Sequence, residues 1–215
     1  MQILTETVGL FAENTYFIVD EATLEAIVID PGDEALRLLD VIQVSRLKVR
    51  YILGTHGHLD HVGAVSELRR ATSAPFHLHD GDRGLLEALP AQAALFGVPA
   101  PPVPEVDGRL REDQVIQFGE GPLDIKVICT PGHSPGGVTF QTAAGLFVGD
   151  ALFFGSIGRT DLPGGDTRTL LESIEKRILS FPDETRIYPG HGPVTTVGRE
   201  RLSNPFLQSD FLSDE

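Results

Sequence analysis

The hydrophobic positions of this chain fall into short runs separated by glycine, proline and charged residues. Two runs near the start, 15–19 and 26–30, flank a charged turn, which is typical of a β-hairpin. After Pro31 and Gly32, apolar residues at positions 36, 39 and 42 follow helical spacing and lead into an apolar strand over 49–53. The first part of the chain therefore predicts a β-α-β arrangement.

The rest of the chain continues this mixture of strands and helices. We expect a helix over 62–71, a strand over 75–78, one or two helices over 81–96 and a proline-rich loop over 98–108. Strands with glycine-rich turns follow over 114–118, 123–129, 138–142 and 145–148, then a helix over 167–179, a strand over 186–188 and a polar tail. Two strand-rich halves of this kind would bury both sheets by packing them together with the helices outside.

Length and composition indicate a globular protein. The 215 residues suffice for one sizeable core and are short for two, so we expect a single domain over 1–215. Hydrophobic residues make up 41% of the chain and charged residues 22%, which is typical of folded rather than disordered chains. The 17 basic and 31 acidic residues give a net charge of −14, which disfavours nucleic acid as a partner.

The start of the chain indicates a cytoplasmic protein. The first residues lack the basic and apolar regions of a secretory signal. The longest uncharged stretch, 88–104, contains five prolines and is too broken to span a bilayer, so we expect no membrane contact. The single cysteine, Cys129, excludes an intramolecular disulfide and a thiolate-rich cluster. Any metal must therefore be held by nitrogen and oxygen.

Three of the seven histidines stand within six residues, in His56-Gly57-His58-Leu59-Asp60-His61, directly after an apolar strand. A strand end is rigid enough to aim side chains outward, and Gly57 lets the turn fold tightly. We expect His56 and His58 to converge on one ion. Asp60 and His61, further round the turn at the start of a helix, would face a second ion.

Two imidazoles do not complete a metal site, so the remaining ligands must come from elsewhere in the chain. Candidates stand at three glycine-flanked junctions after short apolar runs, and they are His133, Asp150 and His191. A buried Asp150 needs a cation or hydrogen-bond donors beside it, because burying an unpaired carboxylate is costly. A carboxylate that bridges two dications fits this position.

In order and spacing, these seven residues resemble the signature of the metallo-β-lactamase superfamily, over nearly the whole chain. The resemblance implies an α/β (α+β) fold, a four-layer αβ/βα sandwich of two mixed β-sheets with helices on the outer faces. It would place the metals at one edge of the two sheets. It implies that the first metal is held by His56, His58 and His133, the second by Asp60, His61 and His191, and that Asp150 bridges both.

Within the superfamily, residues 156–161 and Asp150 resemble the glyoxalase II (hydroxyacylglutathione hydrolase) group and its short bacterial relatives. Many true β-lactamases have Cys where Asp150 stands, which disfavours antibiotic hydrolysis. Full-length glyoxalase II has a helical C-terminal domain that contributes to the glutathione site. Only residues 192–215 follow His191, so we expect no separate domain of this kind, and recognition of glutathione stays open.

The resemblance predicts a dinuclear metal-dependent hydrolase with two divalent ions, zinc in the first place and iron or manganese as alternatives. A metal-bridging hydroxide would cleave a thioester, because a thiolate leaves with little help from a general acid. Asp60 would orient this water or shuttle its proton. Arg159 would pair with Asp161 or meet a substrate carboxylate. The expected partner is a small acyl-thiol, and a homo-oligomer stays open.

Two other functions stay open. The persulfide dioxygenase family is similar in the same motifs, and it would hold one iron on His56, His133 and Asp150. A non-catalytic metal- or partner-binding protein could also use this scaffold. For His77 and His79 we expect surface or capping roles, and for Cys129 a buried apolar one. Segment 88–104 is a lid, a subunit contact or part of the core.

Overall fold

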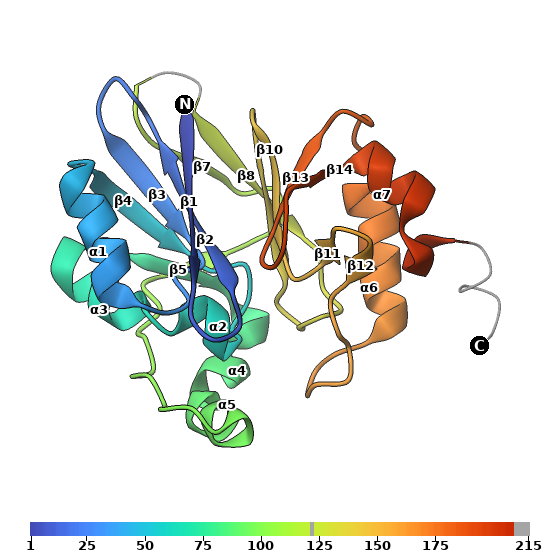
Figure 1. The fold of residues 1–215 in the computed structure, drawn as a ribbon, viewed down its shortest axis with the longest axis horizontal. Helices are drawn as coiled ribbons and strands as arrows, with labels where there is room; N and C mark the ends of the chain where they lie inside the picture. The colour runs from blue at the N-terminus through green and yellow to red at the C-terminus, as the bar shows by residue number, and fades with distance from the viewer. Residues whose placement is uncertain (121–122, 209–215) are drawn as a thin grey trace.

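The protein is described from a computed structural model, which covers residues 1–120 and 123–208. Two six-stranded sheets pack against each other, and helices cover the outer side of each (Figure 1). Both sheets are mixed, so the predicted sandwich is confirmed. That residues 1–215 form one domain stays a prediction.

The first sheet contains the predicted hairpin and the β-α-β segment. Its spatial order is β1 (Gln2–Val8), β2 (Glu13–Val19), β3 (Glu25–Ile29), β4 (Lys48–Leu53), β5 (Phe76–His79) and β6 (Gly108–Leu110). The pairs from β1 to β3 are antiparallel and those from β3 to β6 are parallel. The helices of this half are α1 (Ala35–Val44), α2 (Leu59–Val62), α3 (Val65–Thr72), the 3-10 helix η1 (Asp80–Asp82), α4 (Arg83–Glu87) and α5 (Leu89–Phe96).

The second sheet is built from the glycine-rich half of the chain. Its spatial order is β14 (Thr195–Thr196), β13 (Arg186–Pro189), β10 (Gly145–Gly149), β9 (Val138–Thr142), β8 (Asp124–Cys129) and β7 (Val115–Gln117). Only the β10–β13 pair is parallel. A small hairpin of β11 (Leu152–Phe153) and β12 (Ser156–Ile157) follows β10, and the helices are α6 (Thr167–Ser173), the π-helix η2 (Ile174–Ile178), α7 (Val197–Ser203) and the 3-10 helix η3 (Pro205–Leu207).

Strand β2 shows how the sandwich is filled, because all seven of its residues are buried. Successive side chains of a strand point to opposite faces. Tyr16 and Ile18 therefore pack between the sheets, against residues such as Phe140, while Phe17 and Val19 pack on the helix side. A separate apolar cluster joins the outer face of the second sheet to α6, η2 and α7. The core thus has three layers, one between the sheets and one outside each.

The predicted polar tail is wrong for residues 197–207, which form α7 and η3; residues 209–215 of that tail lie outside the described residues. The pattern missed α7 because it is anchored partly by a buried charged residue. Glu200 is fully buried and accepts hydrogen bonds from the Thr195 hydroxyl (2.5 Å), the Asn204 amide (2.9 Å) and the Gly155 N–H (2.8 Å). Strands β1, β6 and β14, all at or near sheet edges, were not predicted either.

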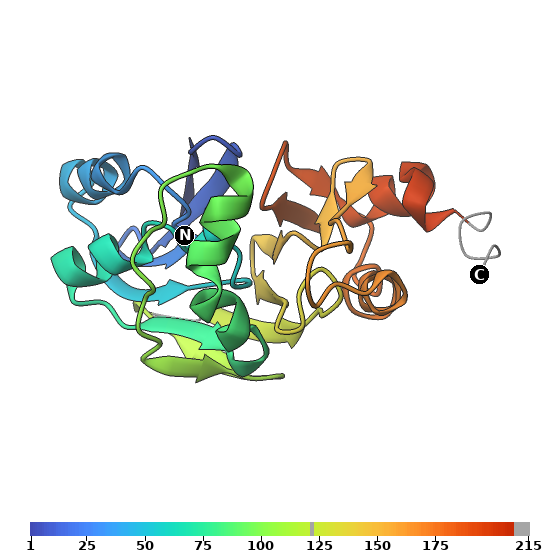
Figure 2. The same cartoon turned by 90° about the horizontal axis from the view of Figure 1, so that it is seen from below.

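The parallel strands and their loops meet at one edge of the sandwich. Seen from below, α4 and α5 (green) lie at this end of the first half, beside the second half (Figure 2). Within the described residues, no helix is long and apolar enough to cross a membrane.

Candidate metal centre

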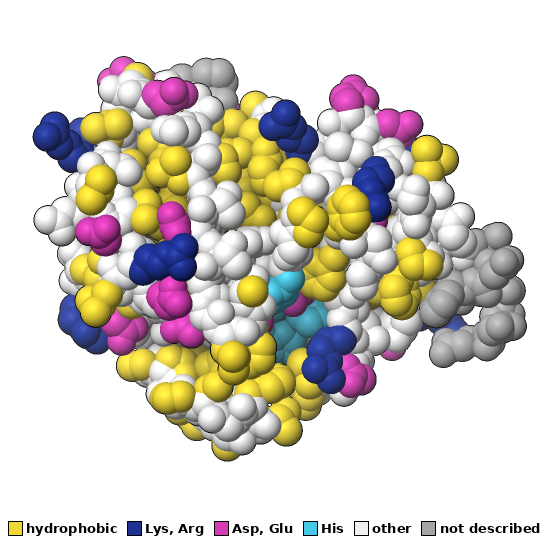
Figure 3. All heavy atoms as spheres, viewed as in Figure 1, with side chains coloured by type: hydrophobic (Ala, Val, Ile, Leu, Met, Phe, Trp, Pro, Cys, Tyr) yellow, Lys and Arg dark blue, Asp and Glu magenta, His cyan; other side chains and the backbone are white. Residues whose placement is uncertain are grey.

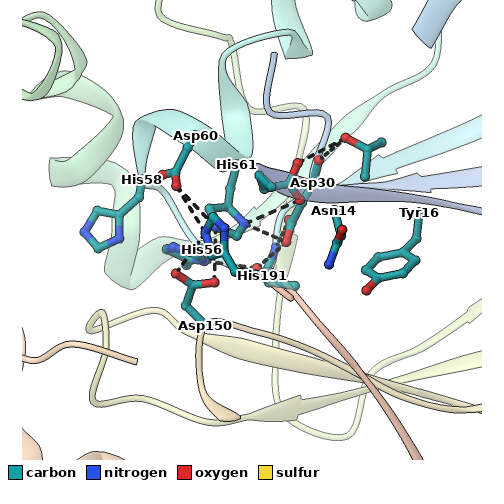
Figure 4. A network of polar contacts seen from close by, with 12 residues as sticks. Asn14, Tyr16, Asp30, His56, His58, Asp60, His61, Asp150 and His191 are labelled. Atoms are coloured by element: carbon teal, nitrogen blue, oxygen red, sulfur yellow. Dashed lines mark hydrogen bonds and ion pairs between the residues drawn. The ribbon is translucent and has the colours of Figure 1, made fainter. Parts of the chain in front are cut away.

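The seven predicted ligands come together at this edge, and each follows the end of a strand. His56 and His58 lie in the loop after β4, and Asp60 and His61 belong to the short helix α2 that continues it. The other three follow β8, β10 and β13, and they are His133, Asp150 and His191. Figure 4 shows Asp60, His61, Asp150 and His191 directed toward one another, with His56 among them.

The ligand atoms form two groups. In the first, nitrogen atoms of His56, His58 and His133 all lie within 4.8 Å of one another, and His58 Nδ1 is 2.9 Å from His133 Nε2. In the second, ligand atoms of Asp60, His61 and His191 also lie within 4.8 Å of one another, and His191 Nε2 is 3.3 Å from Asp60 Oδ2. Three donors at these separations can reach a common ion about 2.0–2.2 Å from each.

Asp150 lies between the two groups. Its Oδ1 atom is 3.3 Å from His61 Nε2 in the second group. Its Oδ2 atom is 3.6 Å from His133 Nε2 in the first group and 3.6 Å from His191 Nε2 in the second. One carboxylate therefore faces both groups, as a bridging ligand must.

Three atoms of the cluster are buried without a hydrogen-bond partner, and they are His56 Nε2, His61 Nε2 and Asp150 Oδ1. A buried polar atom left unpaired costs about 1–3 kcal/mol, and more when it carries charge. A cation in the first group would satisfy His56 Nε2, and one in the second would satisfy His61 Nε2 and Asp150 Oδ1. The residues therefore fit the metals that the sequence predicts.

The second nitrogen of four histidines is already bound by the protein, which fixes the tautomer. His133 Nδ1 donates to the Arg159 carbonyl (2.7 Å) and His191 Nδ1 to the Phe11 carbonyl (3.0 Å). The Nδ1 atoms of His56 and His61 contact the Thr55 hydroxyl and the Asp30 carboxylate, each at 3.0 Å. Each Nε2 atom is thus directed into the cluster as a ligand. In His58, the Nδ1 atom faces the group instead.

The two groups differ in charge. Burial and the neighbouring imidazoles lower the pKa of His56 well below its usual value and that of His58 to about 3, so both rings are neutral. Burial also opposes the charge on His61, but the carboxylates of Asp150 and Asp60 raise its pKa well above the usual value. The Asp150 carboxyl is buried, yet His61 and its neighbours lower its pKa. In the metal-free protein, the protonated His61 ring therefore supplies the positive charge that balances these carboxylates.

Two buried aspartates that the sequence interpretation missed support the cluster. Asp30, at the end of β3, accepts the Thr55 N–H and hydroxyl (both 2.6 Å) as well as contacting His61. Asp82, in η1, accepts hydrogen bonds from the Gly57 N–H (2.9 Å), the Ser134 hydroxyl (2.7 Å) and the Gly136 N–H (2.6 Å). Asp82 thereby ties the loop of His56 and His58 to the loop of His133.

At Gly190 the backbone approaches the cluster closely. A methyl group at Gly190 would overlap the Asp150 carboxylate and lie 2.6 Å from His61 Cε1. Only glycine therefore fits between His191 and these two side chains.

The metallo-beta-lactamase superfamily model matches residues 8–191, which include all seven of these residues. The chain belongs to the metallo-β-lactamase superfamily. The hydroxyacylglutathione hydrolase GloC of Haemophilus influenzae is 39% identical over 216 residues, which cover 97% of this chain and 99% of that protein. The predicted likeness to the glyoxalase II group is thus confirmed.

Solved structures of the superfamily share the whole fold. The B3 metallo-β-lactamase BLEG-1 is 39% identical with a TM-score of 0.90, over 97% of this chain and all of that one. The di-iron-bound form of TTHA1623 is 44% identical with a TM-score of 0.86, over 95% of this chain and all of that one. The chain therefore has the metal-binding fold of the superfamily.

A cleft of about 350 Å³ opens over the cluster, and a small molecule would reach the metals through it. His58, Asp60, His133, Asp150 and His191 line its floor. Arg159 lines its wall, where its guanidinium donates two 2.7 Å hydrogen bonds to Asp161. The predicted pairing of these two residues is therefore present.

Three other residues singled out in the sequence lie apart from the ligand groups found in the described chain. His79 Nδ1 accepts the Gly81 N–H (3.2 Å) and caps η1, and the His77 ring packs edge-on against Tyr51. Cys129 is half-buried, and burial together with Glu112 raises the pKa of its thiol to about 11. The expected capping role therefore holds for His79.

Proposed function

We propose that this chain is a dinuclear metal-dependent thioesterase that hydrolyses acyl-thiols of the hydroxyacylglutathione class. The observation that carries the proposal is the placement of Asp150 between two groups of three ligands at the floor of an open cleft. The likeness to GloC over nearly its full length supports the substrate class.

In this proposal His56, His58 and His133 hold one ion, Asp60, His61 and His191 hold the other, and Asp150 contacts both. Bound divalent ions would acidify a coordinated water to a pKa near 7 and polarise the acyl carbonyl. Zinc suits the imidazole and carboxylate donors, as iron and manganese do. The di-iron form of TTHA1623 supports iron as an alternative.

The chain's own residues orient the reaction. Asp60 is partly exposed in the cleft, and its Oδ2 faces His191, so it is placed to hold the attacking water and to accept its proton. The carbonyls of Phe11 and Arg159 keep His191 and His133 in the ligand tautomer. The leaving group is a thiolate, which needs no strong general acid nearby.

The proposal is tested by hydrolysis of S-lactoylglutathione with protein loaded with zinc, iron or manganese. We expect hydrolysis by the loaded protein and a loss of at least about 100-fold in kcat/KM for Asp150→Ala and His58→Ala. Glu172→Ala is the control, since this exposed carboxylate on α6 pairs with Lys176 and does not line the cleft. Full activity of Asp150→Ala with an unchanged circular dichroism spectrum would contradict the proposal.

Two observations favour other reactions at the same centre. Asp150 stands where many β-lactamases have Cys, but the likeness to the B3 metallo-β-lactamase BLEG-1 favours β-lactam hydrolysis, which a chromogenic cephalosporin tests directly. The di-iron form of TTHA1623 supports iron as a metal for this fold, which the predicted persulfide dioxygenase would use, and oxygen consumption by the iron-loaded protein with glutathione persulfide tests that reaction. If either rate exceeded thioester hydrolysis, the proposed function would be replaced. A loaded protein inactive in all three assays would favour the non-catalytic alternative.

A further inference from the structure

A second cavity adjoins the cleft over the metal centre. The main cavity of about 350 Å³ and a neighbouring one of about 260 Å³ share Phe11 and Asp60 in their walls. Phe11 comes from the turn between β1 and β2, Phe96 from the end of α5 and Phe153 from β11. The Phe11 and Phe96 rings pack edge to face with centroids 5.1 Å apart. Three aromatic side chains from distant parts of the chain therefore surround the entrance to the ligands.

The walls carry little positive charge. Among the described residues that line the two cavities, Arg159 is the only lysine or arginine, and Asp161 already binds its guanidinium. The second cavity adds the carboxylate of Asp33 to that of Asp60, which both cavities share. Apart from the metal ions, these walls offer a charged acyl substituent little attraction.

Gln92, a neutral polar side chain in the wall, already makes hydrogen bonds within the protein. Gln92 Oε1 accepts the Leu59 N–H (2.9 Å), and its Nε2 donates to the Leu85 carbonyl (2.8 Å). Both ends of the amide thus hold α2 and α4 in place. Gln92 therefore contributes to the shape of the wall, but little of its hydrogen-bonding capacity remains for a substrate.

Apolar side chains extend from the cleft onto the surface. Leu10 is 77% exposed, Leu95 is 70% exposed and Phe96 is 38% exposed. Figure 3 shows hydrophobic side chains gathered beside the hollow in which the histidines are visible. An apolar rim next to an open site marks a place where a ligand buries apolar surface.

We propose that this cleft selects thioesters whose acyl group carries an aromatic or branched apolar substituent on the carbon next to the carbonyl. The inference rests on the proposed thioesterase function. The oxygen of water bonds to the acyl carbon, the C–S bond breaks with its electron pair on sulfur, and the proton passes to the thiolate. Phe96 and Phe153 contact the apolar substituent and act as specificity-determining residues.

The first test measures binding without hydrolysis. S-(2-phenylethyl)glutathione and S-ethylglutathione are inert thioethers that differ by one phenyl ring at the position of the acyl substituent. We expect calorimetry to give a Kd at least about 10-fold lower for the phenylethyl compound, because burying a ring in an apolar wall gives discrimination of this order. Phe96→Ala and Phe153→Ala should each shrink the ratio several-fold. Equal affinity of the two compounds for the unsubstituted protein would overturn the inference.

Phe154→Ala is the matched control. Phe154 adjoins Phe153 in sequence, but its ring packs under the Arg199 guanidinium, 3.3 Å from the ring centroid, outside the cleft. This variant should keep the full ratio of the two Kd values. A ratio lowered equally in Phe153→Ala and Phe154→Ala would show a general effect on folding and would overturn the assignment of the wall.

The second test uses S-mandeloylglutathione and S-lactoylglutathione, which carry phenyl and methyl groups on the same carbon. We expect kcat/KM to favour the mandeloyl thioester by at least about 10-fold. Hydrolysis of both at equal rates would overturn the inference and leave the proposed function standing. Hydrolysis of neither, with tighter binding of the phenylethyl thioether, would reject the thioesterase and retain the apolar binding site.

Discussion

The Nδ1 atom of His61 lies 3.0 Å from the Oδ2 atom of Asp30, at the end of strand β3. The same carboxylate accepts the Thr55 hydroxyl (2.6 Å), and that hydroxyl lies 3.0 Å from His56 Nδ1. One buried carboxylate therefore orients a proposed ligand of each ion. Neither His61 nor His56 can turn without breaking this network.

Removing the Asp30 carboxylate should weaken metal binding while all seven proposed ligands remain. Carboxylates that orient ligating histidines are typically worth about 10–100-fold in metal affinity, and we expect a loss of this size for Asp30→Ala. Competition with a chromophoric chelator measures it. Asp33→Ala, an exposed aspartate three residues away, is the control. Unchanged affinity in Asp30→Ala would show that the network does not set the geometry of the ligands.

Asp82 should contribute more to stability than to chemistry. Asp82→Ala leaves two N–H groups and a hydroxyl without their buried acceptor. We therefore expect the free energy of unfolding to fall by about 2–4 kcal/mol. Urea unfolding of the metal-free protein measures this change. Asp80→Ala, which removes an exposed carboxylate paired with Arg83, should cost less than about 1 kcal/mol. Equal losses in the two variants would contradict the role of Asp82.

Metal binding should release protons. The pKa of His61 is raised in the metal-free protein, so its ring is protonated at neutral pH and must lose that proton to bind an ion. The raised pKa also stabilises the metal-free protein below about pH 6.5, and this contribution is lost as the pH rises through the folded-state pKa. Calorimetric zinc titrations in buffers with different protonation enthalpies should give different heats. Heats that do not depend on the buffer would contradict a protonated His61.

The sequence predicted the parts of this molecule that depend on local pattern. The runs 16–19 in β2, 26–29 in β3 and 145–149 in β10 are buried and apolar on both faces, so their burial between helices and a second sheet followed from their composition. The seven proposed ligands stand in short motifs at strand ends. Their chemistry could therefore be inferred before their distances were known.

The rest depends on contacts between distant residues. Nothing local marks Asp82 as the acceptor for Gly57 and Gly136, which lie 25 and 54 residues away. Helix α7 is anchored in part by the buried Glu200, so its hydrophobic pattern is weak. Asp30 could have been identified from the sequence, because it directly follows an apolar strand just as Asp150 does.

The central claim is that this chain holds two metal ions bridged by Asp150, and metal content per chain tests it most directly. The protein is purified without an affinity tag, loaded with zinc or iron, freed of excess ion by gel filtration and measured by elemental mass spectrometry. We predict close to two ions per chain, one in His61→Ala, and a clear loss from both sites in Asp150→Ala. A single ion per chain that His61→Ala leaves unchanged would contradict the dinuclear centre and direct attention to the mononuclear dioxygenase.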